Sequence, residues 1–222
     1  AIVTCGGLCP GLNDVIRAIV LEAYHAYNTP SVLGIRYGLE GFIPSYSHNV
    51  MELTPASVEH IYQFGGTLLG SSRGPQEPSE IVDALERLNV SVLFVIGGDG
   101  SFRAARDLSD GFGVPTIGIP GTIDNDLQYT DYTLGFDTAV NTCLDIINKL
   151  RDTMTSHERI SVVEVMGRHC GDIALYSGIA SGAEIIVVPE ITFDMDDIVM
   201  KINRSRASGK HSNIIVVAEG VM

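Results

Sequence analysis

A glycine-rich segment at 96–101 carries the first residues suited to phosphate and metal chemistry. It reads Ile-Gly-Gly-Asp-Gly-Ser and follows an apolar run. Glycines let the backbone approach a phosphate chain closely, and the Asp99 carboxylate is a hard oxygen ligand of the kind Mg²⁺ prefers. We therefore predict that 98–101 contacts a phosphorylated ligand and that Asp99 binds a metal. An aspartate that only caps a helix is the alternative interpretation.

Paired carboxylates follow a second apolar run, in the segment Pro-Gly-Thr-Ile-Asp-Asn-Asp at 120–126. Asp124 and Asp126 are two residues apart, so in an extended segment their side chains share a side. One carboxylate could then activate a hydroxyl while the other holds a metal. The alternative is a solvated turn rich in Asp and Asn. The position after a third strand favours the functional interpretation.

Three more turns carry glycine or arginine. The turn at 5–11 joins an apolar run to a helical pattern, where unpaired N–H groups favour an anion. Arg73 lies in the Gly-Ser-Ser-Arg-Gly turn and Arg168 in the Met-Gly-Arg turn. A guanidinium suits phosphoryl oxygens through its planar fork, although exposed or purely structural turn residues remain the alternative for each segment.

Apolar runs and helical patterns alternate along the chain and supply the elements that would position these turns. Continuous apolar runs are typical of parallel strands covered on both faces by helices. The expected strands are 1–5, 31–35, 92–96, 116–119, 160–166, 185–188 and 214–218, and the clearest helices are 13–27, 79–88 and 136–150. This order predicts an α/β fold, a Rossmann-like three-layer α/β/α arrangement with mostly parallel sheets. We expect two similar lobes, 1–135 and 136–222, the second incomplete.

The composition excludes several classes of protein. Of the 222 residues, 45% are hydrophobic and 18% are charged, which is unlike a disordered chain. The formal net charge of −13 disfavours general binding to nucleic acid or to anionic membranes. The longest apolar runs are far shorter than a bilayer span. Four cysteines without paired C-x-x-C motifs favour a reducing, cytoplasmic setting and no thiol role.

Taken together and in this order, the motifs resemble those of 6-phosphofructokinases over essentially the whole chain. The similar segments are the turn with Pro10-Gly11 and Asn13, Gly-Ser-Ser-Arg, Gly-Gly-Asp-Gly-Ser, Pro-Gly-Thr-Ile-Asp-Asn-Asp, Gly-Phe-Asp-Thr-Ala at 135–139 and Met-Gly-Arg-x-x-Gly-Asp. The resemblance implies transfer of a phosphoryl group from ATP to the 1-hydroxyl of fructose 6-phosphate, a step of glycolysis. It also implies Mg²⁺ as cofactor and a homo-oligomer, a dimer or a tetramer.

The same resemblance assigns roles to residues at matching positions. Asp124 resembles the catalytic base, Thr122 a group that positions substrate and phosphate, and Arg73 a residue that steadies charge on the transferring group. The implied nucleotide contacts are Gly7, Arg73, Gly74, Gly98, Asp99, Gly100 and Ser101, with Asp99 and Asp126 as metal residues. The implied substrate contacts are Thr122, Ile123, Asp124, Arg159, Met166, Gly167, Arg168 and Glu219. Arg159 resembles a residue lent across a subunit interface.

Gly100 and Gly121 favour ATP as the phosphoryl donor. In the pyrophosphate-dependent members of the family these positions are typically Asp and Lys, and glycine at both leaves room for a nucleotide. A pyrophosphate-dependent enzyme and a non-catalytic nucleotide-binding domain remain the alternatives.

The chain departs from the family in three respects. It stops at Met222, before the segment that completes the sugar-phosphate site, so we expect a fragment or isolated domain with weak or absent turnover. Arg17 is retained where the best-known bacterial enzymes bind an effector, but Leu21 and Pro55 replace arginines, which disfavours that regulation. The opening Gly-Leu-Cys-Pro-Gly and the Ser-Arg-Gly-Pro turn look more like the plant and related bacterial branch.

Overall fold

The computed structural model describes residues 1–221 and divides into two compact units, Ala1–Thr122 and a second that begins at Ile123. The sequence placed the boundary at 135. The structure assigns 123–135 to the second unit because Ile123 packs on that unit's core and Asn125 is hydrogen-bonded to Thr133 and Asp172. These contacts join residues up to 47 positions apart, which local patterns do not reveal.

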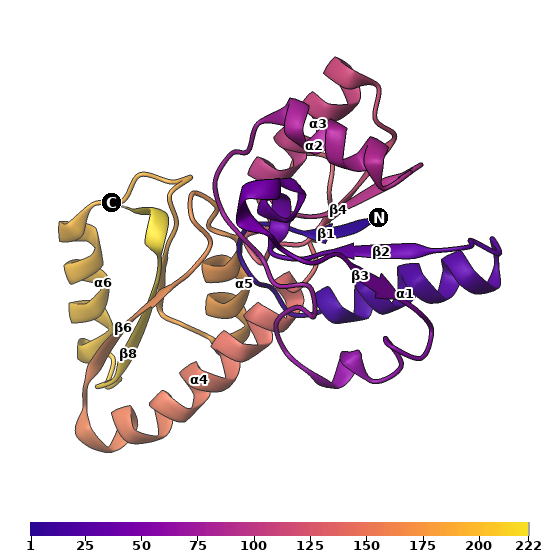
Figure 1. Ribbon diagram of the computed structural model, residues 1–222. Coiled ribbons are helices and arrows are strands. Elements are labelled where there is room, and N and C mark those ends of the chain that lie inside the picture. Colours follow the sequence, from indigo (N-terminus) through magenta and orange to yellow (C-terminus); the bar gives the residue numbers. More distant parts are fainter. Residues whose placement is uncertain (222) are drawn as a thin grey trace. The chain divides into compact units, whose positions relative to one another are not determined.

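The first unit is a five-stranded sheet with helices on both faces (Figure 1). Its strand order is β3-β2-β1-β4-β5, in which only β3 is antiparallel to its neighbour. The strands are β1 (Ile2–Thr4), β2 (Val32–Ile35), β3 (Met51–Leu53), β4 (Leu93–Gly97) and β5 (Thr116–Pro120). The helices are α1 (Leu12–His25) on one face and α2 (Pro78–Arg87) and α3 (Asp99–Phe112) on the other, with 3₁₀ turns at Gly38–Phe42, Pro44–Tyr46 and Ile61–Gln63. The direction of winding reverses between β1 and β4, and the carboxyl ends of strands at such a reversal are where open α/β sheets bind ligands.

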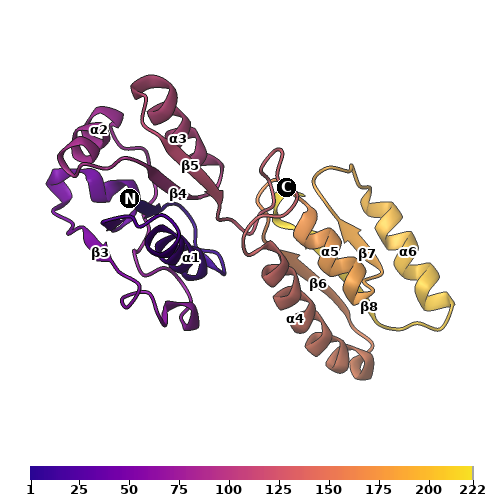
Figure 2. The ribbon, with the colours of Figure 1, turned by 90° about the vertical axis from the view of Figure 1, so that its right-hand side faces the viewer.

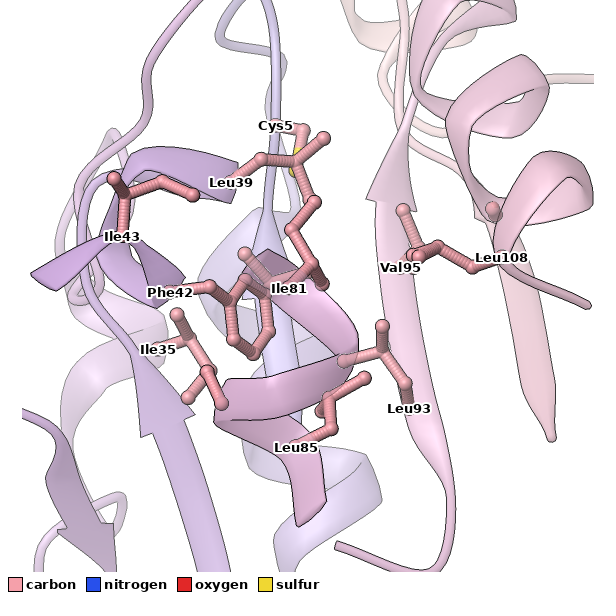
Figure 3. Close-up of a cluster of buried hydrophobic side chains, with 13 residues drawn as sticks. Cys5, Ile35, Leu39, Phe42, Ile43, Ile81, Leu85, Leu93, Val95 and Leu108 are labelled. Atoms are coloured by element: carbon pink, nitrogen blue, oxygen red, sulfur yellow. The ribbon is translucent and has the colours of Figure 1, made fainter. Parts of the chain in front are cut away.

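One core cluster of the first unit lies between this sheet and α2 and α3 (Figure 3), and buried residues of α1 such as Ile16 and Val20 pack on the other face. Ile81 and Leu85 are four residues apart on α2, so both point from one helix face into the cluster that contains Phe42 and Leu93. This packing fixes the strands whose ends carry the glycine turns.

The second unit is a three-stranded parallel sheet of order β6-β8-β7 (Figure 2). Its strands are β6 (Ile160–Val165), β7 (Ile185–Val187) and β8 (Asn213–Ala218), and a 3₁₀ turn follows at Glu219–Val221. The helices α4 (Phe136–His157) and α5 (Asp172–Ser181) pack on one face, and α6 (Met195–Ala207) packs on the other through Ile198 and Ile202.

The predicted α/β architecture with mostly parallel sheets is confirmed, and all seven expected strands are present. Beyond the elements predicted by range, the structure has the helices α3, α5 and α6 and the strand β3. β3 has only three residues, and α6 has no buried residue to mark an apolar face. The expectation that helices cover both faces of every strand is wrong for β6, where Val162 is 65% exposed because α6 packs on β7 and β8 instead. None of the helices within residues 1–221 is both long enough and apolar enough to cross a membrane.

Candidate functional site

Two turns of the first unit meet at the carboxyl end of β1 and enclose a pocket. The Thr4 hydroxyl donates to the Gly70 carbonyl at 2.7 Å, and the Ser71 hydroxyl donates to the Gly6 carbonyl at 2.7 Å. The Gly6 N–H in turn donates to the Ser72 carbonyl at 3.0 Å. The pocket has a volume of about 420 Å³ and is lined by Gly6, Gly7, Leu8, Thr67, Gly70, Ser71, Ser72 and Arg73. The structure therefore joins two motifs that are separated by more than sixty residues.

Arg73 and Gly7 face each other across this pocket. A Cβ atom added to Gly7 would lie 3.6 Å from Nη2 of Arg73, which is ordinary van der Waals contact, so the glycine turn lies directly beside the guanidinium. Gly74 is exposed and has a φ of +105°, a left-handed conformation that glycine adopts without strain. The pocket thus offers one cationic fork and several hydroxyl groups, a combination suited to phosphoryl oxygens.

The residues 98–101 form the turn from β4 into α3. Asp99 is the first residue of α3, and its carboxylate is paired with Arg103 one turn later, with 2.8 Å between Oδ2 and Nη2. The Gly121 N–H donates to the Gly97 carbonyl at 3.0 Å, which brings Thr122 beside this turn. A Cβ atom on Gly98 would lie 3.6 Å from Cβ of Thr122. The amino end of α3 consequently presents a carboxylate, a hydroxyl group and the positive end of the helix dipole.

The donor set at Asp99 fits Mg²⁺ only as part of a nucleotide complex. Within residues 1–221, no three His, Cys, Asp or Glu side chains gather into a metal site. Mg²⁺ is commonly held by one or two carboxylates together with phosphate oxygens and water, and the half-exposed Asp99 carboxylate can serve as that protein ligand.

Gly100 and Gly121, the two residues that favour ATP as the phosphoryl donor, have different surroundings. A Cβ atom on Gly100 would meet no atom within 4 Å, so the space beside it is open. A Cβ atom on Gly121 would lie 2.8 Å from Cγ2 of the buried Ile96 and 3.2 Å from the Gly97 nitrogen. In this chain, tight packing accounts for glycine at 121 without reference to the donor, and only Gly100 borders open space that a nucleotide could use.

In the second unit, the segment that carries Asp124 and Asp126 is not extended. The chain bends at Ile123 and Asp124, and Asn125 adopts a left-handed conformation with a φ of 56°. The expectation that the two carboxylates share a side in an extended segment is therefore wrong. Asp124 is buried, with 9% of its surface exposed, whereas Asp126 approaches Arg168, with 4.0 Å between Oδ2 and Nη1.

The turn after β6 is held by a carboxylate from the end of β8. Oε1 of Glu219 accepts the backbone N–H groups of Gly167 at 2.9 Å and Arg168 at 2.7 Å. Both turn residues have positive φ, 143° and 52°, and Gly220 leaves the space that the Arg168 carbonyl occupies. Met166 and Arg168 are exposed, so this turn presents a guanidinium and an apolar side chain to solvent.

Arg159 lies apart from the other predicted substrate residues. It precedes β6 and is exposed, whereas Met166, Gly167 and Arg168 follow the same strand. A six-residue strand separates the two ends by roughly 20 Å. Within one chain, the structure does not bring Arg159 to the Arg168 turn.

Burial disfavours the thiolate form of the cysteines. Burial raises the pKa of Cys5 to about 12 and that of Cys9 to about 11. Burial also raises the pKa of Cys170, and the carboxylates of Asp172, Glu190 and Asp126 raise it further.

Sequence reasoning missed several polar residues of these turns. Thr67, Ser71 and Ser72 line the pocket beside Arg73, and the hydroxyl residues of the Gly-Ser-Ser-Arg turn were a signal for them. The four-residue spacing of Asp99 and Arg103 was a signal for their ion pair. No local signal connects Asn125 with Asp172.

Comparisons with known proteins agree with this arrangement. The family model "Phosphofructokinase" matches residues 1–222. An ATP-dependent 6-phosphofructokinase of Clostridium tetani is 54% identical over 99% of this chain, and ATP-dependent 6-phosphofructokinase 1 of Clostridium perfringens is 51% identical over 100% of it. The chain spans 69% of each of these relatives. The structure of phosphofructokinase from Saccharomyces cerevisiae aligns with a TM-score of 0.88 and 30% identity, over 99% of this chain and 33% of that one.

Proposed function

Because the chain belongs to the phosphofructokinase family, we propose that it transfers a phosphoryl group from ATP to the 1-hydroxyl of fructose 6-phosphate. The products are fructose 1,6-bisphosphate and ADP, and the step belongs to glycolysis. The observation that carries the proposal most directly is the pocket at the carboxyl end of β1, where Arg73 meets the glycine turn at Gly6 and Gly7.

The first unit supplies the donor side. Gly7, Arg73 and Gly74 contact the nucleotide from the two joined turns, and the open space beside Gly100 accommodates it. Gly98 and Ser101 contribute backbone and hydroxyl donors at the amino end of α3. The Arg73 guanidinium stabilises negative charge on the group in transfer, because its positive charge and N–H groups line this pocket.

Asp99 holds Mg²⁺ in this proposal, and Asp126 is a second candidate ligand. Bound Mg²⁺ neutralises charge on the phosphate oxygens. The Asp99 carboxylate is paired with Arg103 one turn along α3, so this guanidinium must share the carboxylate with Mg²⁺ or release it when the metal binds. Thr122, beside the same turn, donates its hydroxyl to the reacting phosphate.

The second unit supplies the acceptor side. Asp124 takes the proton from the attacking 1-hydroxyl, as a general base within hydrogen-bond reach of that group. Ile123, Met166, Gly167 and Arg168 border the sugar phosphate, and Arg168 offers its guanidinium to an anion. Glu219 uses one carboxylate oxygen to hold the turn and keeps the other for sugar hydroxyls.

We further propose a homo-oligomer in a cytoplasmic setting. The position of Arg159 supports the oligomer, because this residue lies far from Arg168 in its own chain and is exposed for use by a neighbouring subunit.

A donor-selective activity assay tests the proposal. The full-length native protein is incubated with fructose 6-phosphate, Mg²⁺ and either ATP or pyrophosphate, and formation of the bisphosphate is measured. We expect turnover with ATP, and a loss of about 100-fold or more in Asp124→Asn, which keeps the size of the side chain but removes the base. Asp131→Asn, an exposed aspartate of the same segment, is the matched control and should retain activity.

Two other outcomes would favour the alternatives. Faster turnover with pyrophosphate than with ATP would show that pyrophosphate is the phosphoryl donor. Binding of nucleotide without turnover in the wild-type protein would instead make this a non-catalytic binding domain.

A further inference from the structure

Asn125 connects the segment of Asp124 and Asp126 to two other parts of the second unit. Its Nδ2 donates to Oδ2 of Asp172 at 2.7 Å, and its Oδ1 accepts the Thr133 N–H at 3.0 Å. Its carbonyl oxygen also accepts a weaker hydrogen bond from the Cys170 thiol at 3.9 Å. One side chain thereby joins residues 8 and 47 positions away.

The chemistry of both neighbours requires an amide at this position. A backbone N–H can only donate and an ionised carboxylate can only accept, so the two contacts need one acceptor and one donor on the same side chain. Aspartate has the same shape but cannot donate to Asp172. Glycine tolerates the φ of 56° equally well but makes neither contact. Asparagine meets the backbone and side-chain requirements together.

The anchor at Asp172 is firmly held. Asp172 is the first residue of α5, and the next two residues, Ile173 and Ala174, are buried in the core of the unit. The preceding Gly171 donates its N–H to Oε1 of Glu190 at 2.7 Å. A hydrogen bond to Asp172 therefore ties Asn125 to a helix terminus that cannot shift without disturbing the core.

Asn125 is bonded directly to both residues whose side chains matter for the reaction. Rotation about its φ and ψ angles changes the separation of the Asp124 and Asp126 Cα atoms, because the peptide groups on either side of Asn125 are planar and these two angles are the only backbone torsions that alter that separation. The two hydrogen bonds of the Asn125 side chain restrict that rotation.

We infer that Asn125 is a positioning residue, which sets the direction of the Asp124 carboxylate through its hydrogen bond to Asp172. This inference rests on the proposed function, in which Asp124 is the general base. Because Asn125 acts on the base rather than on substrate affinity, its loss should lower kcat more than it raises KM for fructose 6-phosphate.

An exchange of the two side chains tests the inference. The variants are Asn125→Asp, Asp172→Asn and the double variant Asn125→Asp/Asp172→Asn, made in the full-length native protein. Asn125→Asp places two carboxylates face to face, whereas the double variant restores one donor and one acceptor in reversed order. The matched control is Asn141→Asp on α4, where Asn141 Nδ2 lies 3.4 Å from Oδ2 of Asp137 on the exposed helix surface.

We expect kcat of Asn125→Asp to fall by about 10- to 100-fold, the loss that a displacement of about 1 Å can cause. KM should change by less than threefold, and the double variant should recover kcat to within about threefold of wild type. Asn141→Asp should remain within twofold of wild type in both constants.

Two results would overturn the inference. One is a folded Asn125→Asp protein with wild-type kcat. The other is a double variant that regains the wild-type melting temperature but not kcat, and this comparison decides the matter if Asn125→Asp does not fold. Absence of turnover in the wild-type protein would count against the proposed function itself, and so is distinguishable from both.

Discussion

Two glycines at the proposed donor site are constrained for different physical reasons, although both lie in similar glycine-containing motifs. Gly100 and Gly121 both follow strands in glycine motifs, yet one borders open space and the other is packed against Ile96 and Leu12. A side chain at position 100 should lower the affinity for the ligand, whereas a side chain at position 121 should lower the stability of the fold.

Substitution of these glycines separates the two effects. We expect Gly100→Asp to fold with nearly wild-type stability and to lose affinity for MgATP, because the new carboxylate extends into the space proposed for the nucleotide. Gly121→Ala should lower the free energy of unfolding by about 1–3 kcal/mol through overpacking. Urea unfolding and calorimetric titration with MgATP measure the two quantities. Unchanged MgATP affinity in Gly100→Asp would remove the remaining support that Gly100 gives to ATP as donor.

At the scale of the elements, a single carboxylate helps to hold β7 and β8 in register. Glu184 precedes β7, and its Oε2 accepts the Ile214 N–H at 2.5 Å while its Oε1 is paired with Lys210. Burial by itself would raise the pKa of Glu184, but the Ile214 hydrogen bond and the Lys210 charge outweigh it, and the pKa is lowered.

This shift predicts a pH-dependent contribution to stability. A carboxyl group with a lowered pKa in the folded state stabilises the fold above its unfolded pKa, near 4.5, and loses that contribution as the pH falls through the folded value. We therefore expect Glu184→Gln to be less stable than wild type at pH 7, and the difference to stay constant down to about pH 4.5 and then shrink as the pH falls through the lower folded pKa. Urea unfolding at several pH values measures it. A difference that also stays constant below about pH 4.5 would contradict the ionic role.

At the scale of the whole molecule, the proposed substrate residues are divided between the two ends of one strand. Arg159 precedes β6 and Arg168 follows it, so a single subunit does not place both at one sugar phosphate. A homo-oligomer resolves this separation if a neighbouring subunit contributes Arg159.

Subunit complementation tests this arrangement. Arg159→Ala and Asp124→Asn should each be nearly inactive alone in the full-length native protein. When subunits are mixed and exchanged, some sites receive an intact Asp124 from one chain and an intact Arg159 from its neighbour. For a dimer, about a quarter of the wild-type rate should return. No recovery despite demonstrated subunit exchange would show that Arg159 does not act across subunits.

The amino-acid sequence by itself determined every strand except the short β3, the alternation of strands and helices, and the turns that carry chemistry. Continuous apolar runs such as 92–96 and 214–218 are local signals, and each became a largely buried strand because a run without polar residues is stable only where both of its faces are covered. The motifs were equally local, which is why their order along the chain sufficed to indicate the family.

Only the tertiary structure decided how the motifs are combined. Contacts between distant residues joined Gly6 to Ser72 and Asn125 to Asp172, bent the segment of Asp124 and assigned residues 123–135 to the second unit. The exposed face of the edge strand β6 was also not predictable from local sequence, because the exposure of Val162 depends on where α6 packs and not on the sequence of β6. Such features depend on packing and hydrogen bonds between segments that are far apart in the chain, and hydrophobic periodicity and turn chemistry do not encode them.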